Sequence, residues 1–411
     1  MKISLFCPSM YGGGAEKISL NLANFFATSG YETELILLKK TGPYYKYIDR
    51  SVKVKIINPF FNILIPFYLL KHRLKTRPDI ILSTLKPTSI ILGFCKYFSS
   101  FTSTIVLHEP STMYGVNHMP LINRALHIMS MKLSYRNFDG IIANSQATLD
   151  DLKKYKMVND NYTIIGNPVI SQNTKSLISQ NFDHEWLDDN KIKVIISVGR
   201  LDKNKDFKTL IDAFSISYKE LPYLRLLILG EGSERSNLQK YIEQYKLSKV
   251  IQLFGFVDNP FPFYKKSDLF ILTSLSEGFG NVIVEALVSG IYVISTKSGG
   301  PEDIITNDKF GLLTDINRPD LLADKINNFF IYKKKHVSNS ESFNKFSVNI
   351  VANEYLNFFK NLLKNQKISI FSGTLGGGGA ERMVLNLTNT LVERGYNVDL
   401  ILVNKTGNYI D

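Results

Sequence analysis

Residues 270–305 read FILTSLSEGFGNVIVEALVSGIYVISTKSGGPEDII. The apolar run at 269–273 predicts a buried strand, and the glycines of the SEGFGN segment predict a turn before a helix. A second apolar run follows at 292–295. Strand, helix and strand in this order are typical of a parallel α/β sheet, whose ligand sites lie at the carboxyl ends of the strands.

Two glutamates lie eight residues apart in this stretch, and we expect Glu277 at the strand end and Glu285 two turns into the helix. The residues between them offer backbone N–H groups at a helix N-terminus, which suit a phosphate or sugar hydroxyls. The alternative is a pair of solvent-exposed helix glutamates. Apolar residues around Glu285 weaken that alternative: Ile283, Val284, Ala286 and Leu287.

Upstream, Val198-Gly199-Arg200 ends another predicted strand, and Lys205 follows just before a helix. An Arg and a Lys at a strand end can hold a diphosphate and neutralise it as it leaves, without a metal ion. The surrounding LDKNKD loop is polar, so spacing alone favours a solvated surface pair.

A glycine turn follows the first predicted strand, at residues 12–14. Gly13 and Gly14 allow close approach of a ligand to the backbone, and the helix beginning near Ala15 has a positive dipole end. The spacing is not that of the G-x-G-x-x-G dinucleotide motif. A purely structural tight turn is an equally good interpretation of these glycines.

The opening of the chain occurs twice. Residues 2–46 and 367–411 match at an offset of 365, including GGGAE at 12–16 and 377–381. This period far exceeds the 20–50 residues of solenoid repeats, so it predicts one enzyme-sized unit followed by the start of a second copy, as in a truncated tandem protein. We expect the partial copy to be a poorly packed tail or an added edge on a neighbouring sheet.

Apolar strands alternate with amphipathic helices through the first 365 residues, which predicts two Rossmann-like, doubly wound α/β domains. The predicted domains are residues 1–170, residues 171–341, a closing helix at 342–366 and the partial repeat at 367–411, with a polar linker near 171–190. Strands are expected near 3–7, 34–38, 79–83, 104–107, 140–143, 193–198, 225–229, 251–254, 269–273 and 292–295.

Composition is that of a globular protein, with 44% hydrophobic and 21% charged residues. No apolar run qualifies as a signal peptide, and two cysteines give no disulfide framework, which fits the cytosol. Of the net charge of +12, most lies in residues 1–165, which contain 20 Lys and Arg against 10 Asp and Glu. This half is expected to meet an anionic partner.

One apolar segment, residues 56–74, is followed at once by basic residues. It is too short, and interrupted by Pro66, to span a bilayer. Peripheral attachment to anionic lipid and a buried core helix explain it equally well. The basic residues predicted to touch the membrane surface are Lys71, Arg73, Lys75 and Arg77.

Taken together, several blocks resemble the retaining nucleotide-sugar glycosyltransferases of family 4, which have the GT-B fold of two Rossmann-like domains. The resemblance spans essentially all of residues 1–364. The matching blocks are GGGAEK (12–17), VGRLDKNKDFKTLIDAF (198–214), ILGEGSERSNL (228–238), LFGFVDN (253–259) and residues 270–305.

The resemblance implies a role for each matching residue. Arg200 and Lys205, with Gly199 before them, would bind the donor diphosphate, and Glu285 would hold the ribose hydroxyls. Glu277 and the backbone of Gly278, Phe279, Gly280 and Asn281 would contact the donor sugar and diphosphate. Gly13 and Gly14 would close on the donor.

The resemblance also implies that His108, at a strand end, lies near the transferred sugar. Many relatives have Asp after this His, whereas this chain has Glu109 and Pro110. The role of Glu109 therefore stays open. Asn144 and Ser145 are weaker candidates for contact with a substrate.

The resulting expectation is a retaining, metal-independent hexosyltransferase that needs no cofactor. It would move a hexose from a UDP-sugar to a lipid-linked or glycan acceptor in surface polysaccharide or glycolipid synthesis. We expect it on the inner face of the membrane as a peripheral cytoplasmic protein. The alternatives are a nucleotide-sugar 2-epimerase of the same fold and a non-catalytic basic binding protein. Nucleic acid is not expected as a partner, because aromatic residues do not alternate with basic ones.

Overall fold

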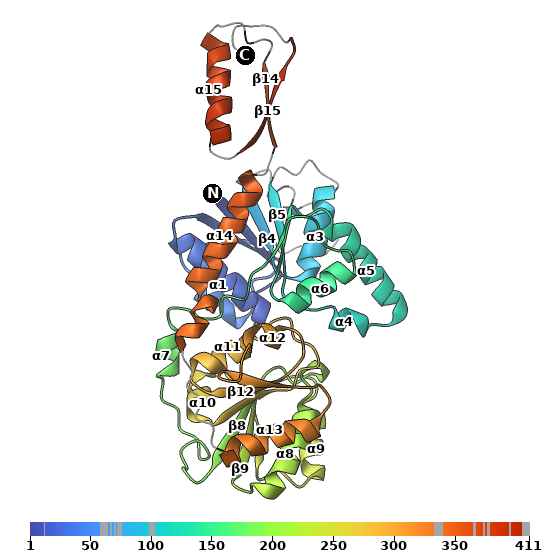
Figure 1. Cartoon of the computed structure of the whole chain (residues 1–411), viewed down its shortest axis with the longest axis vertical. Helices are drawn as coiled ribbons and strands as arrows, with labels where there is room; N and C mark the ends of the chain where they lie inside the picture. Colours follow the sequence, from blue (N-terminus) through green and yellow to red (C-terminus); the bar gives the residue numbers. More distant parts are fainter. Residues whose placement is uncertain are drawn as a thin grey trace. The chain divides into compact units, whose positions relative to one another are not determined.

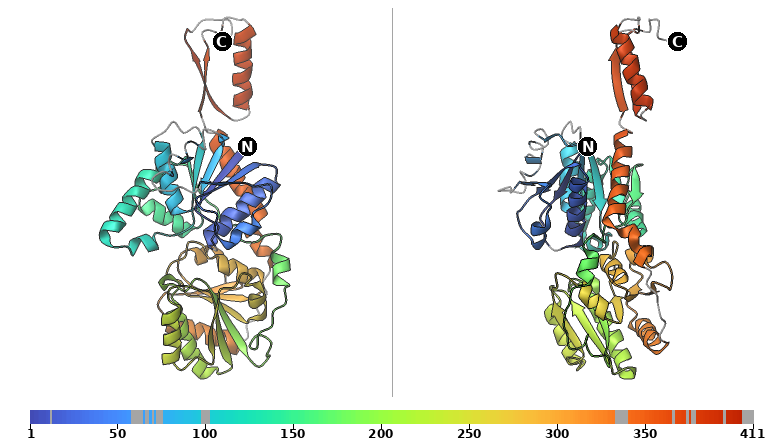
Figure 2. Two further views of the ribbon diagram at one scale, coloured as in Figure 1. Left: turned by 180° about the vertical axis from the view of Figure 1, so that it is seen from behind. Right: turned by 90° about the vertical axis from the view of Figure 1, so that its left-hand side faces the viewer.

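The computed structural model describes residues 1–11, 13–57, 65, 68, 69, 71, 76–97, 103–332, 340–364, 367–372, 375, 379–393 and 396–404. The chain divides into two compact units, residues 1–352 and 353–411, and helix α14 (Val348–Lys364) contains the boundary. Within the first unit there are two parallel sheets, each with helices packed against it (Figure 1 and Figure 2).

The first sheet has seven parallel strands in the order β3-β2-β1-β4-β5-β6-β7. Its strands are β1 (Lys2–Cys7), β2 (Glu32–Leu37), β3 (Lys53–Ile56), β4 (Ile80–Ser83), β5 (Thr104–Glu109), β6 (Gly140–Ala143) and β7 (Tyr162–Ile164). The helices around it are α1 (Gly14–Thr28), α3 (Lys86–Tyr97), α4 (Tyr114–Asn117), α5 (Leu121–Tyr135) and α6 (Gln146–Lys154), with a 3-10 turn η1 (Pro43–Tyr47). Strand order reverses between β1 and β4, as in doubly wound folds.

The second sheet has six parallel strands in the order β10-β9-β8-β11-β12-β13. Its strands are β8 (Lys193–Val198), β9 (Leu224–Leu229), β10 (Ile251–Gly255), β11 (Leu269–Leu272), β12 (Tyr292–Thr296) and β13 (Gly311–Thr314). Its helical elements are α7 (Thr174–Ile178), η3 (Lys203–Lys205), α8 (Phe207–Glu220), α9 (Arg235–Gln244), α10 (Phe261–Lys266), α11 (Asn281–Val288), α12 (Gly300–Ile304), α13 (Pro319–Tyr332) and η4 (Ser340–Phe346).

The strands of the second sheet are buried on both faces. Ile195 of β8 belongs to one apolar cluster, whereas its neighbours Val194 and Ile196 belong to another. Successive strand residues point to opposite faces, so this alternation means that helices cover both sides of the sheet. The predicted pair of doubly wound, Rossmann-like α/β domains is confirmed.

Three short strands were absent from the sequence prediction, namely β3, β7 and β13. The predicted polar linker near 171–190 is wrong in part, because it contains α7 and several side chains packed on the core of the second domain. Leu177, Phe182 and Trp186 are among them. Their irregular spacing gives no helical or strand period, so the pattern concealed their burial.

The partial repeat forms β14 (Lys367–Ser372), α15 (Gly379–Glu393) and β15 (Asn397–Leu402). Ile370 faces Leu400 in parallel register, as Leu5 faces Leu35 in the first copy. Within the described residues β14 and β15 form a sheet of two strands only. The predicted added edge on another sheet is therefore wrong, and the predicted poor packing is confirmed by exposed apolar side chains on both strands and the helix.

Candidate active site

The carboxyl ends of strands from both sheets of the first unit meet around the turn between β11 and α11. Thr112, after β5, hydrogen-bonds to Ser276, after β11, with 2.6 Å between their hydroxyl oxygens. Asn167 donates to the side-chain oxygen of Asn281 at 2.7 Å. These contacts bring loops of the two domains together at the edge where parallel α/β sheets bind ligands.

Glu277 lies in this turn with its backbone fixed by two hydrogen bonds. Its N–H donates to Ser298 O at 2.8 Å, and its carbonyl accepts from Gly300 N at 2.8 Å. Its carboxylate forms an ion pair with Lys205 and accepts a hydrogen bond from Ser274 at 3.2 Å. Two predicted site residues, Lys205 and Glu277, thus come from different strand ends to share one largely buried contact.

Arg200 behaves differently from its predicted partner Lys205. Its side chain is 78% exposed, and its Nε donates to Asp202 at 2.6 Å. Lys205 ends η3 and is followed by Asp206, which caps α8 from the left-handed conformation at φ 44°. This strained position fixes the backbone next to Lys205, whereas the Arg200 side chain extends into solvent beside Asp202.

Gly199 precedes Arg200, and its backbone packs closely against that of Gly230. A Cβ at Gly199 would be in ordinary contact with Lys205, so space alone does not require glycine there. The neighbouring Gly230 is required, because its φ is +144° and a Cβ would lie 1.9 Å from Gly199 O. The close approach of these two strand ends sets the position of Gly199.

Glu285 is the fifth residue of α11, slightly more than one turn from its start and not the two turns that the sequence led us to expect. Its carboxylate is buried and accepts from Lys17 Nζ at 2.7 Å and from Tyr264 OH at 3.5 Å. Burial lowers the pKa of Lys17, but the adjacent Glu285 carboxylate more than reverses this, so that the pKa is raised. Lys17 belongs to the GGGAEK block, but nothing in the sequence around it indicates Glu285 as its partner.

The glycines between the two glutamates hold the backbone in conformations that a side chain would disturb. Gly280 has φ +100°. A Cβ at Gly278 would lie 2.3 Å from Pro110 O, so the loop after β5 packs directly on this turn. Phe279 is buried and packs edge-on against Phe346, with ring centroids 5.3 Å apart. Its side chain therefore belongs to the core, which leaves only its backbone for a ligand.

The glycine turn of the first domain lies beside the same helix start. A Cβ on Gly14 would lie 3.2 Å from the Asn281 side-chain nitrogen. Gly13 is the N-cap of α1, and a Cβ there would meet the Glu16 carboxylate at 2.4 Å. Burial raises the pKa of Glu16, while the positive charge of Arg200 acts in the opposite direction. Gly12 lies outside the described residues.

His108 lies within β5, one residue before its end, and its ring is fully buried. Burial lowers its pKa to about 3, so the imidazole is neutral at physiological pH. In this structure the ring reaches no surface, and the predicted role of His108 stays a prediction.

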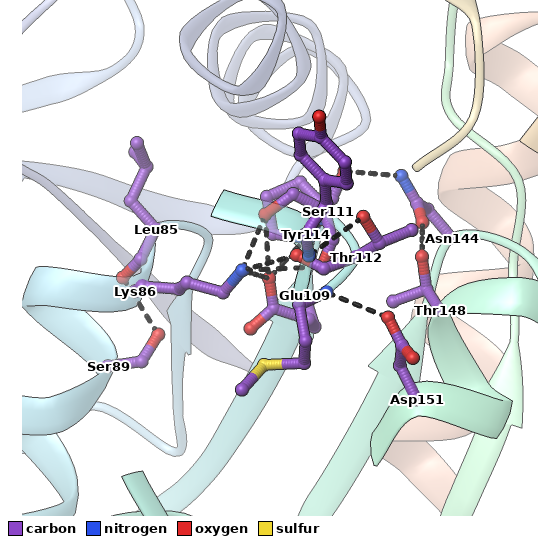
Figure 3. Close-up of polar contacts among 12 residues, drawn as sticks. Leu85, Lys86, Ser89, Glu109, Ser111, Thr112, Tyr114, Asn144, Thr148 and Asp151 are labelled. Atoms are coloured by element: carbon purple, nitrogen blue, oxygen red, sulfur yellow. Dashed lines mark hydrogen bonds and ion pairs between the residues drawn. The ribbon is translucent and has the colours of Figure 1, made fainter. Parts of the chain in front are cut away.

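Glu109 is the centre of a buried polar cluster that the sequence did not indicate (Figure 3). Its carboxylate lies 3.4 Å from Lys86 Nζ and accepts from Tyr135 OH at 2.8 Å. Lys86 also donates to Ser111 Oγ at 2.8 Å and to Thr112 O at 2.9 Å. Since Lys86 is the first residue of α3, where a cation opposes the helix dipole, the Glu109 carboxylate must compensate for its position.

Asn144 is hydrogen-bonded to the loop that follows Glu109. Its side-chain nitrogen donates to Pro110 O at 2.8 Å, and its oxygen accepts from Thr148 Oγ1 at 2.9 Å (Figure 3). Ser145 caps α6 by accepting from Thr148 N. Both residues thus hold the loop and the helix start, and the network from Lys86 to Asn144 fixes the segment that contacts the Glu277 turn.

Other predicted residues fall outside this region. Lys71 and Arg77 are exposed, whereas Arg73 and Lys75 lie outside the described residues. Two apolar residues of the same segment, Ile65 and Leu69, are buried in the core of the first domain. Across the described parts of the chain, no group of three His, Cys, Asp or Glu side chains is arranged to hold a metal ion.

Comparisons with known proteins agree with this geometry. Residues 12–172 match the family model described as Glycosyltransferase Family 4, and residues 179–342 match Glycosyl transferases group 1. The crystal structure of Anabaena Alr3699/HepE in complex with UDP and glucose has a TM-score of 0.72 at 21% identity, covering 88% of this chain and 99% of that chain. The fold is therefore GT-B, and the two matched models identify a glycosyltransferase of the family 4 and group 1 type.

The related sequences include glycosyltransferases whose names refer to a lipid-linked substrate or to the lipopolysaccharide core. A Campylobacter jejuni protein is 29% identical over 380 residues, or 86% of this chain and 99% of its own length. Its name is N-acetylgalactosamine-N,N'-diacetylbacillosaminyl-diphospho-undecaprenol 4-alpha-N-acetylgalactosaminyltransferase. The lipopolysaccharide core biosynthesis glycosyltransferase LpsE of Rhizobium meliloti is 28% identical, covering 74% of this chain and 82% of the relative. These relatives do not favour the epimerase alternative.

Proposed function

We propose that the chain transfers a hexose from a UDP-sugar to a lipid-linked glycan acceptor with retention of the anomeric configuration. The observation that carries the proposal is two ion pairs, Lys205 with Glu277 in the turn after β11 and Lys17 with Glu285 in the helix α11 that follows it. Both carboxylates lie at the edge where the strand ends of the two domains meet. Complexes of the Anabaena neighbour with UDP support the choice of nucleotide.

In this proposal the donor diphosphate lies between Arg200 and Lys205 and the backbone N–H groups of residues 278–281. The exposed Arg200 turns from Asp202 to the phosphate, and two positive charges offset the charge that develops on the leaving group. Ribose hydroxyls replace Lys17 on Glu285. The sugar lies beside Glu277, whose carboxylate accepts from its hydroxyls.

The acceptor hydroxyl attacks the anomeric carbon from the face on which the bond to the diphosphate breaks. The electron pair of that bond goes to the phosphate oxygen, which takes the acceptor proton. This step needs neither a protein nucleophile nor a metal ion, and the proposal includes no cofactor. The loop that follows Glu109, residues 110–113, forms the first-domain wall beside the sugar, and closure of that wall excludes water.

The acceptor class is inferred from the relatives. The Campylobacter jejuni relative carries diphospho-undecaprenol in the name of its substrate, and LpsE is named for the lipopolysaccharide core. An acceptor of this kind is attached to a membrane, and the basic first domain suits an anionic surface. We therefore place the enzyme at a membrane surface as a peripheral protein of surface polysaccharide or glycolipid synthesis.

The test is UDP release from a panel of UDP-sugars, with and without a membrane lipid extract. Release from one donor that depends on the lipid is the expected result. Lys205→Ala should lower this rate by about 10²–10³. The matched control is Lys193→Ala, which removes another lysine paired with a carboxylate, Asp268 at 2.9 Å, at the amino end of β8. Equal losses in both variants, or no release from any donor, would contradict the proposal.

A further inference from the structure

Helix α5 presents apolar side chains on two opposite faces. On its inner face Met131 and Tyr135 are fully buried in the core of the first domain. On its outer face Leu121 and Ile122 are 78% and 76% exposed. Leu126, Met129 and Leu133 are also exposed and continue this outer face at helical spacing. Met119 extends it just before the helix begins.

Folding does not account for this outer face, because an apolar helix face normally packs against another element. The helix lies at the periphery of the first domain (Figure 1). Side chains of one helix line a shallow groove there that combines apolar and basic residues: Leu121, Arg124, Ala125, Ile128, Met129 and Lys132. A continuous exposed apolar patch of this kind marks an interaction surface.

Charge identifies the partner. Residues 110–138 contain no Asp or Glu, whereas Arg124, Lys132 and Arg136 lie along the helix. A two-fold interface with a second copy would place these positive charges against their own counterparts, which is unfavourable. An anionic bilayer accepts both features, since its headgroups attract the basic residues and its hydrocarbon boundary accepts the apolar ones.

The position of the helix fits an acceptor that remains in the bilayer. Thr112 contacts Ser276 beside Glu277, and the chain then runs through the single turn of α4 into α5. The surface therefore begins a few residues from the wall of the candidate site. In the described part of the chain, no helix has the length and apolar character required to cross a bilayer.

We propose that the outer face of α5, defined by Leu121, Ile122, Leu126, Met129 and Leu133 with its flanking basic residues, docks on an anionic phospholipid bilayer. The inference rests on the proposed function for the membrane-linked acceptor, and it assigns the membrane contact to α5. The basic segment around Lys71 and Arg77 is the competing assignment.

The experiment measures sedimentation of the full chain with sucrose-loaded vesicles, in the absence of donor. One vesicle set is phosphatidylcholine alone, and the other contains about one third phosphatidylglycerol. Ile122→Ser with Leu126→Ser, and separately Arg124→Gln with Lys132→Gln, should each weaken binding to the anionic vesicles by about tenfold or more. The wild type should bind the neutral vesicles much more weakly.

Two matched controls lie in the second domain. Ile331→Ser with Tyr332→Ser removes an exposed apolar pair, and Lys240→Gln with Lys249→Gln removes two exposed lysines. Both controls should bind the anionic vesicles like the wild type. A third variant, Lys71→Gln with Arg77→Gln, tests the competing segment and should retain most of the binding.

Three outcomes would overturn the proposal. The α5 variants could bind anionic vesicles as the wild type does, the controls could lose as much binding, or the Lys71 and Arg77 variant could lose it instead. An α5 variant that turns a dimer into a monomer with unchanged vesicle binding would identify a second copy as the partner. UDP release is measured in a separate assay. Absence of UDP release would therefore contradict the proposed function without changing what vesicle binding says about α5.

Discussion

The first β-α-β segment of the chain and its repeat have the same local structure and opposite burial. Strands β1 and β2 pair in the register that β14 and β15 repeat, and α1 and α15 each have 15 residues. Phe6 is 0% exposed, whereas the equivalent Phe371 is 71% exposed. Ile18 is 2% exposed, whereas the equivalent Met383 is 65% exposed.

The difference between the copies lies in their neighbours. The second edge of β1 pairs with β4, where Ile3 faces Ile80, and helices cover both faces of that sheet. In the part of the repeat that the structure describes, β14 pairs with β15 alone. Two strands and one helix form locally from their pattern, but they bury few apolar side chains without further strands.

Among single substitutions in the two copies, the largest expected effect follows from truncating the equivalent phenylalanines. Phe6→Ala should lower the free energy of unfolding by about 3–5 kcal/mol, because it leaves a cavity in a closed core. Phe371→Ala should change it by less than about 0.5 kcal/mol, because the ring is mostly in water. Urea unfolding followed by circular dichroism measures both. Similar losses in the two variants would mean that the repeat is packed in solution.

Catalysis provides the next test of the comparison. Deleting residues 367–411 should leave UDP release within about twofold, because every residue of the candidate site lies before position 352. Lys205→Ala in the intact chain should lower it by about 10²–10³. Initial rates at saturating donor measure both changes. A deletion that costs as much as Lys205→Ala would show that the repeat takes part in the reaction.

Substitutions on the exposed face of α15 are expected to have a smaller effect. Met383→Lys with Leu387→Lys should leave the free energy of unfolding within about 0.5 kcal/mol and lower the binding of an apolar dye. Ile18→Lys with Leu22→Lys, at the equivalent positions of α1, should prevent stable folding, since it buries two unpaired charges. Dye fluorescence and thermal unfolding distinguish the pairs. Equal stability of the two would remove the contrast between the copies.

The smallest expected effect concerns Glu16 in the glycine turn of the first copy. Its raised pKa means that ionisation costs more in the folded than in the unfolded state, so this group destabilises the fold as pH rises above about 4.5. Glu16→Gln should therefore raise the melting temperature at pH 7, and the gain should shrink at pH 4. Melting curves at the two pH values measure it. A gain that is larger at pH 4 would contradict the sign.

Much of this structure follows from the sequence because local patterns decide it. The apolar runs gave the central strands of both sheets, and the SEGFGN turn gave the position of Glu277 between a strand and a helix. The edge strands were not predicted because they are short and half exposed, as Lys53–Ile56 shows. The linker prediction missed the packing of the partly buried Trp186 and Phe182 on the core, because these residues have no regular period.

The candidate site was predictable only as separate pieces. Arg200, Lys205, Glu277 and Glu285 follow from motifs, but their pairing does not. Lys17 and Glu285 are 268 residues apart in the sequence, and no local pattern connects them. Lys86 was missed and the role of Glu109 stayed open for the same reason, because no local pattern connects the two residues before the strand ends are brought together.

The contact between Gly278 and Pro110 limits how the distance between the two domains at the candidate site can change by mutation. Where a missing Cβ would lie 2.3 Å from a carbonyl oxygen, two main chains touch with no side chain between them. Substitutions can alter the charge and polarity of the surrounding residues. They can hardly change the distance between these two main chains, because no side chain separates them. The two main chains thus fix the distance between the turn after β11 and the loop after β5, and a change in specificity must come from the residues on either side of this contact.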